Sequence, residues 1–390
     1  MEGAILFFSR FPASAGGGGG ARREAQLVEL LLPLGFRFLS CWDSEYMKGR
    51  AKRRASMASR LTKKLSPNRK YWVDDDSWDY VFDLGAIARE WLDRFGSLQN
   101  IRMVILDDPI YFSPLAVHFH QRGIPLVALC QNLESLSLGQ LNRKHQFRLL
   151  QKEIALLKKC SLVVGISREE TFLLRNMGMP VVYLPYYPVH AIQERLGKVR
   201  ENRIHSRKEG YLVLGTAGNK ATLDGMRALI EFWGSPRNSL REEKLLVAGF
   251  WTRKYLPSAP AGNVIILGDI TDAGLDDLLG TVKALVCFQE SGSGALTKIR
   301  EMLLAGVPVL ANSHAARSYH EFNGAGLFEF AGLEDLGRAA AAAMAAATEK
   351  RREQFAPPPM PASLAAAKRD LLARLTALSA GDGLPAATMN

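Results

Sequence analysis

Short apolar runs alternate with amphipathic segments of helical length along almost the whole chain. In segment 21–32, for example, Leu27, Leu30 and Leu31 fall on one face of a helix, and Gly35 follows near its end. Strands that alternate with such segments are typical of a parallel sheet with crossover helices. The pattern predicts strands at residues 4–8, 36–41, 102–106, 126–130, 162–166, 181–184, 211–214, 245–248, 264–267, 284–288, 307–311 and 327–330.

The alternation is interrupted once, between residues 186 and 210. Tyr186-Tyr187-Pro188 ends the first set of strands, and a polar stretch rich in Arg and Lys follows. We therefore predict an α/β protein with two doubly wound domains and a C-terminal helix. The predicted parts are an N-terminal domain at 1–190, a linker at 191–210, a C-terminal domain at 211–355, and a Pro-rich segment with the terminal helix at 356–390.

Composition is consistent with this organisation. The chain has 390 residues, of which 47% are hydrophobic and 23% charged, as in globular proteins with two ordinary domains. No apolar run approaches the roughly 18 residues that a transmembrane helix needs. Glu2 and the short apolar run 4–8 do not fit a signal peptide, so we expect a cytoplasmic protein. The four cysteines form no CxxC pair, and we expect them to be reduced and mostly buried.

The positive charge is concentrated in one segment. Ten of the basic residues and no acidic one lie within 48–70, which accounts for most of the net charge of +11. Met57, Leu61 and Leu65 recur every four residues there, so a helix would carry a thin apolar stripe flanked by cations. Such a helix can bind an anionic membrane surface, where each Lys or Arg contributes roughly 1 kcal/mol, or an anionic acceptor. The alternative is a solvated basic loop opposite the acidic residues 74–76. Nucleic acid has little support because no aromatic residue interleaves the cations.

The segment 290–311 carries the most specific pattern for chemistry. It predicts a strand end, a glycine turn, a helix, and a Gly-Val-Pro turn into another strand. Gly292 and Gly294 let a ligand approach the backbone, and the N–H groups at the helix start can bind a diphosphate. Lys298 would add positive charge to the same anion, and Glu301, on the same helix face, would accept hydrogen bonds from sugar hydroxyls. The alternative is an ordinary turn with a solvated Lys and Glu.

This segment resembles the donor-binding signature of glycosyltransferase family 4, G-x-G-x-x-x-K-x-x-E-x-x-x-x-G-x-P-V-V. The resemblance implies the GT-B fold, in which two Rossmann-like domains face a cleft and the C-terminal domain binds a nucleotide sugar. It extends over about residues 3–330 in separate patches, of which 292–309 is the strongest. The residues that match in register are Gly292, Gly294, Lys298, Glu301, Gly306, Pro308 and Val309.

Two weaker patches resemble the glycine loops of the same family. Residues 5–23 are similar to its first strand, glycine loop and first helix, and the resemblance places Gly17, Gly18 and Gly19 in a loop facing the cleft. A flexible glycine linker is the alternative reading of that run. Residues 214–220 are similar to the opening of the second domain. The resemblance places Gly218 under the diphosphate, and Lys220 either reaches a phosphate or is a solvated lysine.

Two positions depart from the family pattern. Segment 127–135 resembles a strand followed by H-N-x-E, but the histidine that usually faces the donor sugar is Gln131, which forms hydrogen bonds and does not titrate. Asn132 and Glu134 match, although both also suit a polar turn. Many members carry a second glutamate eight positions before the one that matches Glu301. Here that position is Ser293, which we interpret as a subgroup trait.

The resemblance implies transfer of a hexosyl group from a nucleoside-diphosphate sugar to a glycan or lipid-linked acceptor hydroxyl, with retention and without a metal or cofactor. Helix dipole, backbone N–H groups and basic side chains would stabilise the departing diphosphate in place of a cation. Two alternatives remain: a GT-B sugar-nucleotide epimerase, and a catalytically silent binding module, which Ser293 and Gln131 suggest. The predicted catalytic residues are Gln131, Lys298 and Glu301, and the predicted donor-binding residues are Gly218, Lys220, Gly292, Ser293, Gly294, Lys298 and Glu301.

Overall fold

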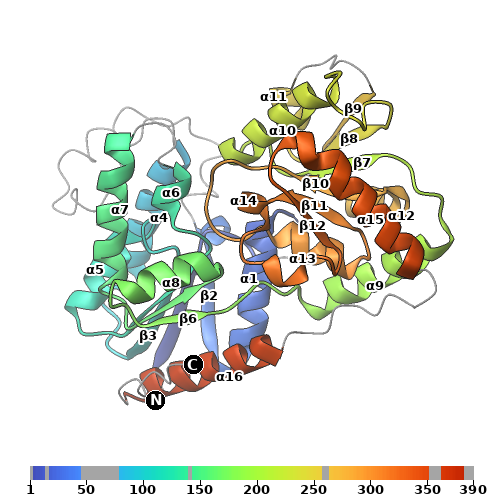
Figure 1. Ribbon diagram of the computed structural model, residues 1–390. Helices are drawn as coiled ribbons and strands as arrows, with labels where there is room; N and C mark the ends of the chain where they lie inside the picture. Colours follow the sequence, from blue (N-terminus) through green and yellow to red (C-terminus); the bar gives the residue numbers. More distant parts are fainter. Residues whose placement is uncertain are drawn as a thin grey trace. The chain divides into compact units, whose positions relative to one another are not determined.

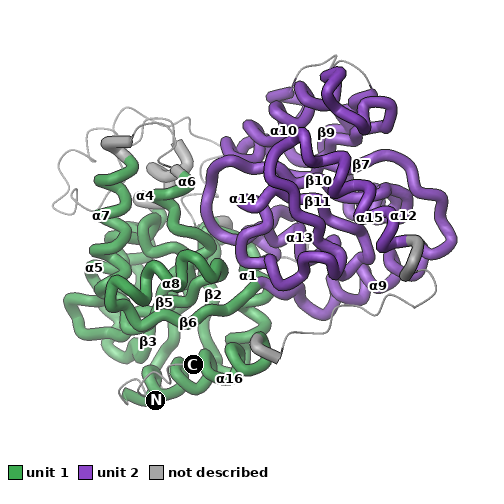
Figure 2. Tube along the Cα trace, in the orientation of Figure 1, with its two compact units in different colours: residues 1–14, 23–185, 362–390 green, residues 15–22, 186–361 purple. Residues whose placement is uncertain are grey.

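The computed structural model describes residues 3–13, 17–44, 79–138, 143–256, 263–350 and 362–381. The chain divides into two compact units, coloured separately in Figure 2. Unit 1 contains residues 1–14, 23–185 and 362–390, and unit 2 contains residues 15–22 and 186–361. The basic segment 48–70 lies outside the described residues, and the interpretation of that segment remains a prediction.

Unit 1 is built on a parallel sheet with the strand order β2-β1-β3-β4-β5-β6. The chain runs from β1 to β2 on one side and then returns to place β3 on the other side of β1 (Figure 1). The direction of winding therefore reverses between β1 and β3, and their carboxyl ends form the switch point of unit 1. The strands are β1 (Ala4–Ser9), β2 (Phe36–Ser40), β3 (Ile101–Asp107), β4 (Leu126–Cys130), β5 (Leu162–Gly165) and β6 (Val181–Tyr183).

The helices of unit 1 pack on a sheet that is apolar on both faces, as in other covered parallel sheets. Phe8 and Trp91 lie at the centre of one core, with ring centroids 4.9 Å apart. The terminal helix α16 contacts β3 and β6 and buries Leu364, Leu371 and Leu375. The helices are α1 (Gly19–Leu31), α4 (Asp79–Phe95), α5 (Ser113–Gln121), α6 (Glu134–Leu138), α7 (Arg143–Leu157), α8 (Arg168–Asn176) and α16 (Ala362–Ala380).

Unit 2 repeats the same winding with the strand order β12-β11-β10-β7-β8-β9, again all parallel. Its switch point lies between β7 and β10. The strands are β7 (Tyr211–Leu214), β8 (Leu245–Ala248), β9 (Val264–Gly268), β10 (Ala284–Cys287), β11 (Val309–Asn312) and β12 (Leu327–Phe330). The helices are α9 (His190–His205), α10 (Lys220–Trp233), α11 (Thr252–Tyr255), α12 (Asp272–Thr281), α13 (Thr297–Leu304), α14 (Ser313–Ala316) and α15 (Leu336–Lys350).

The predicted fold class is confirmed, and each predicted strand is present with ends shifted by at most two residues. The four cysteines are free and buried, as expected. Among the described residues, no helix combines the length and the apolar character needed to cross a membrane.

The domain limits differ from the predicted ones. Residues 191–210, which we predicted to be a linker, lie largely in helix α9, whose Ile192, Leu196 and Val199 are buried. Helix α9 packs on α12 and α13, so this segment is part of unit 2. Residues 15–22 also cluster with unit 2 although they fall in the predicted N-terminal domain, and the terminal helix α16 belongs to unit 1. The charged sequence of α9 concealed its apolar face.

Candidate active site

The loop between β10 and α13 lies at the switch point of unit 2. Gly292 has φ 101° and Gly294 has φ 74°, a left-handed region that favours glycine. These two residues turn the chain between the end of β10 and the start of α13 at Thr297. The predicted strand, glycine turn and helix are therefore present as a local structure.

His314, in α14, and Arg317, the residue after α14, bind the backbone carbonyl groups of this loop. Arg317 donates from Nε to the Gly294 oxygen and from Nη2 to the Ser293 oxygen, both at 2.7 Å. His314 Nε2 lies 3.2 Å from the Gly292 oxygen. Because a carbonyl oxygen only accepts, the Nε2–H of His314 donates in this contact. Burial and the nearby Arg317 lower the pKa of His314. The C=O and N–H of a trans peptide point in opposite directions, so the following amides face away from Arg317.

Lys298 connects helix α13 to the neighbouring strand of the switch point. Its Nζ donates to the Leu214 oxygen at 2.6 Å, where β7 ends. A small cavity adjoins this contact, and its lining includes Leu214, Thr222, Phe288, Gln289 and Lys298. An ammonium group carries three N–H donors, so Lys298 can bind a second acceptor while it keeps the contact to β7.

Glu301 is buried, with an exposed fraction of 2%, and its carboxylate has two strong donors. Tyr186 donates its hydroxyl to Oε1 at 2.6 Å, and Arg22 forms an ion pair with Oε2. Arg22 belongs to the segment 15–22 of unit 2. Residues 17–19, the predicted cleft loop, precede it: Gly17 has φ 94°, and α1 begins at Gly19.

Gly218 and Lys220, the two remaining predicted donor-binding residues of unit 2, have different surroundings. Gly218 lies against the ring of Trp251, and a Cβ atom there would be only 2.4 Å from the indole carbons. Lys220, the first residue of α10, forms an exposed ion pair with Asp224 one turn later. The solvated alternative for Lys220 is therefore the one that agrees with its contacts.

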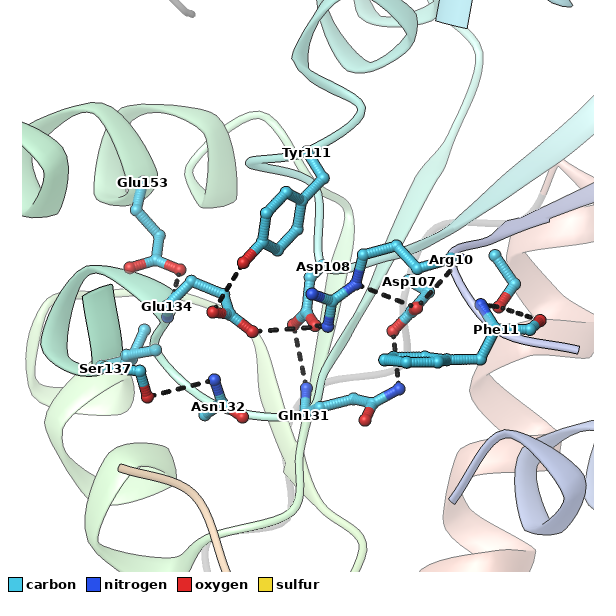
Figure 3. A network of polar contacts seen from close by, with 12 residues as sticks. Arg10, Phe11, Asp107, Asp108, Tyr111, Gln131, Asn132, Glu134, Ser137 and Glu153 are labelled. Atoms are coloured by element: carbon cyan, nitrogen blue, oxygen red, sulfur yellow. Dashed lines mark hydrogen bonds and ion pairs between the residues drawn. The ribbon is translucent and has the colours of Figure 1, made fainter. Parts of the chain in front are cut away.

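A buried charged network occupies the switch point of unit 1 (Figure 3). Arg10 follows β1 and Asp107 ends β3, and Arg10 binds Asp107 Oδ2 through its backbone N–H at 3.2 Å and through Nε at 3.4 Å. Its Nη2 pairs with Asp108 and with Glu134, the latter at 3.3 Å. The Tyr111 hydroxyl donates to Glu134 at 2.7 Å.

Gln131 lies at the edge of this network, directly after β4. Its backbone N–H donates to Asp108 Oδ1 at 2.9 Å, and its Nε2 donates to Asp107 Oδ1 at 3.1 Å. The amide is therefore oriented by a carboxylate, which leaves its carbonyl oxygen to accept another hydrogen bond. Asn132, also part of the family-like patch, donates to Ser137 at 3.4 Å, in line with a polar turn.

Burial dominates the ionisation of the network. It raises the pKa of Asp107 and raises that of Asp108 well above the usual range, although Arg10 opposes the shift. Burial by itself would lower the pKa of Arg10, but Asp108, Asp107 and Glu134 raise it well above its usual value. The pKa of Glu24, on α1, is raised by burial and then by Asp107. Asp107, Asp108 and Glu24 therefore hold their protons more tightly than exposed carboxyls.

The structure thus brings Gly292, Ser293, Gly294 and Lys298 together beside the end of β7, while Gln131 lies in unit 1 and Lys220 points to a surface partner. Sequence reasoning missed Arg10, Asp107 and Arg317. Arg10 and Asp107 follow and end strands that meet at a switch point, which was a usable signal. No sequence signal marked Arg317, because its role depends on a loop that folds beside it. Among the described residues, no group of three or more His, Cys, Asp or Glu side chains is placed to hold a metal ion.

The two doubly wound units define a GT-B fold, as predicted. Three solved structures of this fold match almost the whole chain. HepE of Anabaena, in complex with UDP, is 14% identical, with a TM-score of 0.55 over 96% of this chain and 100% of HepE. Sucrose-phosphate synthase of Thermosynechococcus elongatus is 13% identical, with a TM-score of 0.59 over 97% of this chain and 100% of the synthase.

The third structure is the α,α-trehalose 6-phosphate synthase of Burkholderia multivorans, 12% identical, with a TM-score of 0.59 and 98% coverage of both chains. No protein-family model matches the chain, and no curated protein matches it in sequence. The likeness extends over almost the full length of these chains and shows a shared fold.

Proposed function

We propose that the protein is a glycosyltransferase that moves a hexosyl group from a nucleoside-diphosphate sugar to an acceptor hydroxyl. One observation carries the proposal: the left-handed glycine loop after β10, held by Arg317 through its carbonyl groups, beside Lys298 at the switch point of unit 2. Ligands of doubly wound sheets bind outside the carboxyl ends of the strands at such a point. HepE, which shares the fold, was solved with UDP and with UDP-glucose.

The proposed chemistry uses these groups on the leaving diphosphate. The bond between the anomeric carbon and the β-phosphate oxygen breaks, the acceptor oxygen forms a bond to that carbon, and the acceptor proton passes to the departing diphosphate oxygen. The amides that face away from Arg317, the N-terminus of α13 and the Lys298 ammonium stabilise the negative charge that grows on the diphosphate. In this proposal Glu301 accepts hydrogen bonds from hydroxyl groups of the donor sugar, and Gln131 is a hydrogen-bonding residue near that sugar.

A screen of ligand-induced stabilisation tests the proposal first. We expect at least one nucleoside diphosphate, and the matching nucleotide sugar, to raise the melting temperature, because a ligand that binds only the folded state stabilises it. Slow hydrolysis of that sugar would then separate an enzyme from a silent binding module. Gln131 and Ser293 favour the silent module as the second candidate. If no nucleoside diphosphate and no nucleotide sugar stabilises the protein, both the transferase and the silent binding module are overturned.

We further propose that the transfer is retaining and needs no metal. Lys298, the loop amides and the helix N-terminus supply the positive charge that a cation would otherwise provide. We expect transfer to continue in EDTA. Loss of activity on chelation with rescue by Mg²⁺ would contradict this mechanism, and inversion of the product anomer would contradict retention.

The acceptor side of the proposal comes from the sequence of segment 48–70. Its ten basic residues would bind an anionic membrane surface or a lipid-linked anionic acceptor, which places the enzyme at the inner face of a membrane. Vesicle co-sedimentation tests it. We expect binding to anionic vesicles that weakens with salt, and equal binding to neutral vesicles, or no binding to either, would contradict it.

A further inference from the structure

Trp251 has an unusual backbone conformation for a large side chain. It follows β8 in unit 2, with φ 63° and ψ 12°, in the left-handed region that bulky residues rarely adopt. Its side chain is 53% exposed, so burial of the indole does not explain the strained backbone. Strain of this kind persists where the surrounding structure enforces it, and it clusters at ligand sites.

The surrounding structure fixes the indole at the carboxyl edge of the sheet. The backbone N–H of Trp251 donates to Asp269 Oδ1, just after β9, at 2.9 Å, which holds the main chain at this position. The ring lies so close to Gly218, in the loop after β7, that any side chain there would overlap Cε3 and Cζ3. Trp251 is therefore held from both neighbouring loops, and the absence of a side chain at Gly218 makes room for the ring.

The position of Trp251 fits the length of a nucleoside diphosphate. In the strand order of unit 2, β8 lies two strands from β10, across β7. Neighbouring strands are about 4.8 Å apart, so the loop after β8 is on the order of 10 Å from the loop after β10. A ribose and one phosphate separate a base from the terminal phosphate of a nucleoside diphosphate, which is a comparable span. A flat aromatic surface here is placed for the base.

We propose that Trp251 is the platform on which the base of the nucleoside diphosphate stacks. The inference rests on the proposed function and adds to it the residue that binds the nucleoside part of the donor. Every base has a π face, so an exposed indole held in one orientation binds bases with little dependence on their edges. A sugar ring could also pack on an indole, and the experiment below distinguishes stacking of the base from packing of the sugar.

The test uses Trp251→Gly and Trp251→Phe. Glycine suits the left-handed backbone, so Trp251→Gly is expected to fold, and Trp251→Phe keeps an aromatic ring. Calorimetric titration uses whichever of UDP, GDP and ADP stabilises the wild type most, its nucleotide sugar, and inorganic pyrophosphate. Phe172→Ala, which removes a 69% exposed aromatic side chain of unit 1, is the matched control.

We expect Trp251→Gly to weaken the nucleoside diphosphate about 5-fold to about 150-fold, the range for a lost base–aromatic stack. Trp251→Phe should weaken it less, and Phe172→Ala should leave it unchanged. Pyrophosphate affinity should be the same in all variants. Unchanged affinity of Trp251→Gly for the nucleoside diphosphate, or equal weakening of pyrophosphate, would overturn the inference while the proposed function stands.

Two further outcomes also decide the question. Weakening of the nucleotide sugar alone, with the nucleoside diphosphate unaffected, would assign Trp251 to the sugar ring and overturn stacking of the base. If the wild type binds no nucleoside diphosphate and no nucleotide sugar, the proposed function fails, and this inference fails with it.

Discussion

The two switch points of the molecule have the same topology and opposite chemistry. In unit 1 the carboxyl ends of β1 and β3 are occupied by the buried Arg10, Asp107 and Asp108, which bind one another. In unit 2 the carboxyl ends of β7 and β10 carry a glycine loop and a lysine whose contacts are to backbone carbonyls. At the first edge the charged side chains bind one another, and at the second edge Arg317 and Lys298 bind backbone carbonyl groups of the loop and of β7.

This difference shows that the shared strand order determines where a site can lie and does not determine what the site binds. Buried charges are stable only when paired and hydrogen-bonded, so the network of unit 1 holds its own loops in one conformation. The carbonyl oxygen of Gln131, at the edge of that network, can accept a further hydrogen bond. In unit 2 Gly215 follows β7 directly, and Gly292 and Gly294 lie in the loop after β10, where glycine allows close approach of an anion. We therefore propose that the donor binds to unit 2.

The largest expected effect is in unit 1, from Arg10→Met. Removing one partner of a buried ion pair leaves charges uncompensated, and we expect a loss of about 3–5 kcal/mol in the stability of unit 1 at neutral pH. Hydrogen exchange of the β1 and β3 amides measures it. Arg207→Met, at an exposed ion pair, is the control and should cost less than about 1 kcal/mol. An equally small loss in Arg10→Met would remove the distinction between the two edges.

A pH effect is expected next, at Glu153, whose carboxylate accepts the N–H groups of Glu134 and Ser135 at 2.9 and 3.0 Å. Burial raises the pKa of Glu153 from 4.5 to about 7. Because the folded state binds this proton more tightly than the unfolded state, stability should fall as pH rises from 4.5 to 7. The stability difference between wild type and Glu153→Gln should shrink by on the order of 3 kcal/mol over that window. A difference independent of pH would contradict the shift.

In unit 2 the strongest test is Gly294→Val. A β-branched residue at φ 74° forces the loop out of its conformation, and loss of a preorganised amide site costs about 100-fold or more. We expect nucleoside-diphosphate affinity to fall by that factor, as measured by calorimetry. Gly123→Val is the matched control, since Gly123 has φ 71° and open space around its Cα. It should lower stability and leave affinity unchanged, and equal affinity in both variants would remove the loop from the site.

The smallest expected effect comes from Glu301→Gln. If the carboxylate binds the nucleotide sugar, its affinity should fall by about 1–3 kcal/mol, the range for a lost charged hydrogen bond. Arg22 and Tyr186 already bind Glu301, so a structural role is the competing account. Lower stability with unchanged affinity in the folded variant would support that account. Tyr186→Phe, which removes one partner only, is the comparison.

The fold was predictable from the sequence because apolar strands and amphipathic helices repeat with local periods. The glycine loop with Lys298 was predictable for the same reason, since a strand, a turn and a helix lie within one short segment. The features that were not predicted depend on contacts between residues far apart in the sequence. The apolar residues of helix α9 are interspersed with charged ones, so its packing on α12 and α13 is evident only from the structure. Arg10 and Asp107 are 97 positions apart in the sequence, so their contact could be expected only from the order of the strands that they follow and end.

Hydrogen exchange with and without saturating nucleoside diphosphate tests the assignment of the donor most directly, because it reads both switch points in one experiment. We predict protection of residues 289–298 and 214–219 in unit 2, where the amides and the Lys298 contact lie. Exchange of 289–298 that is unchanged at saturation, while residues 107–111 and 131–135 of unit 1 become protected, would contradict the assignment.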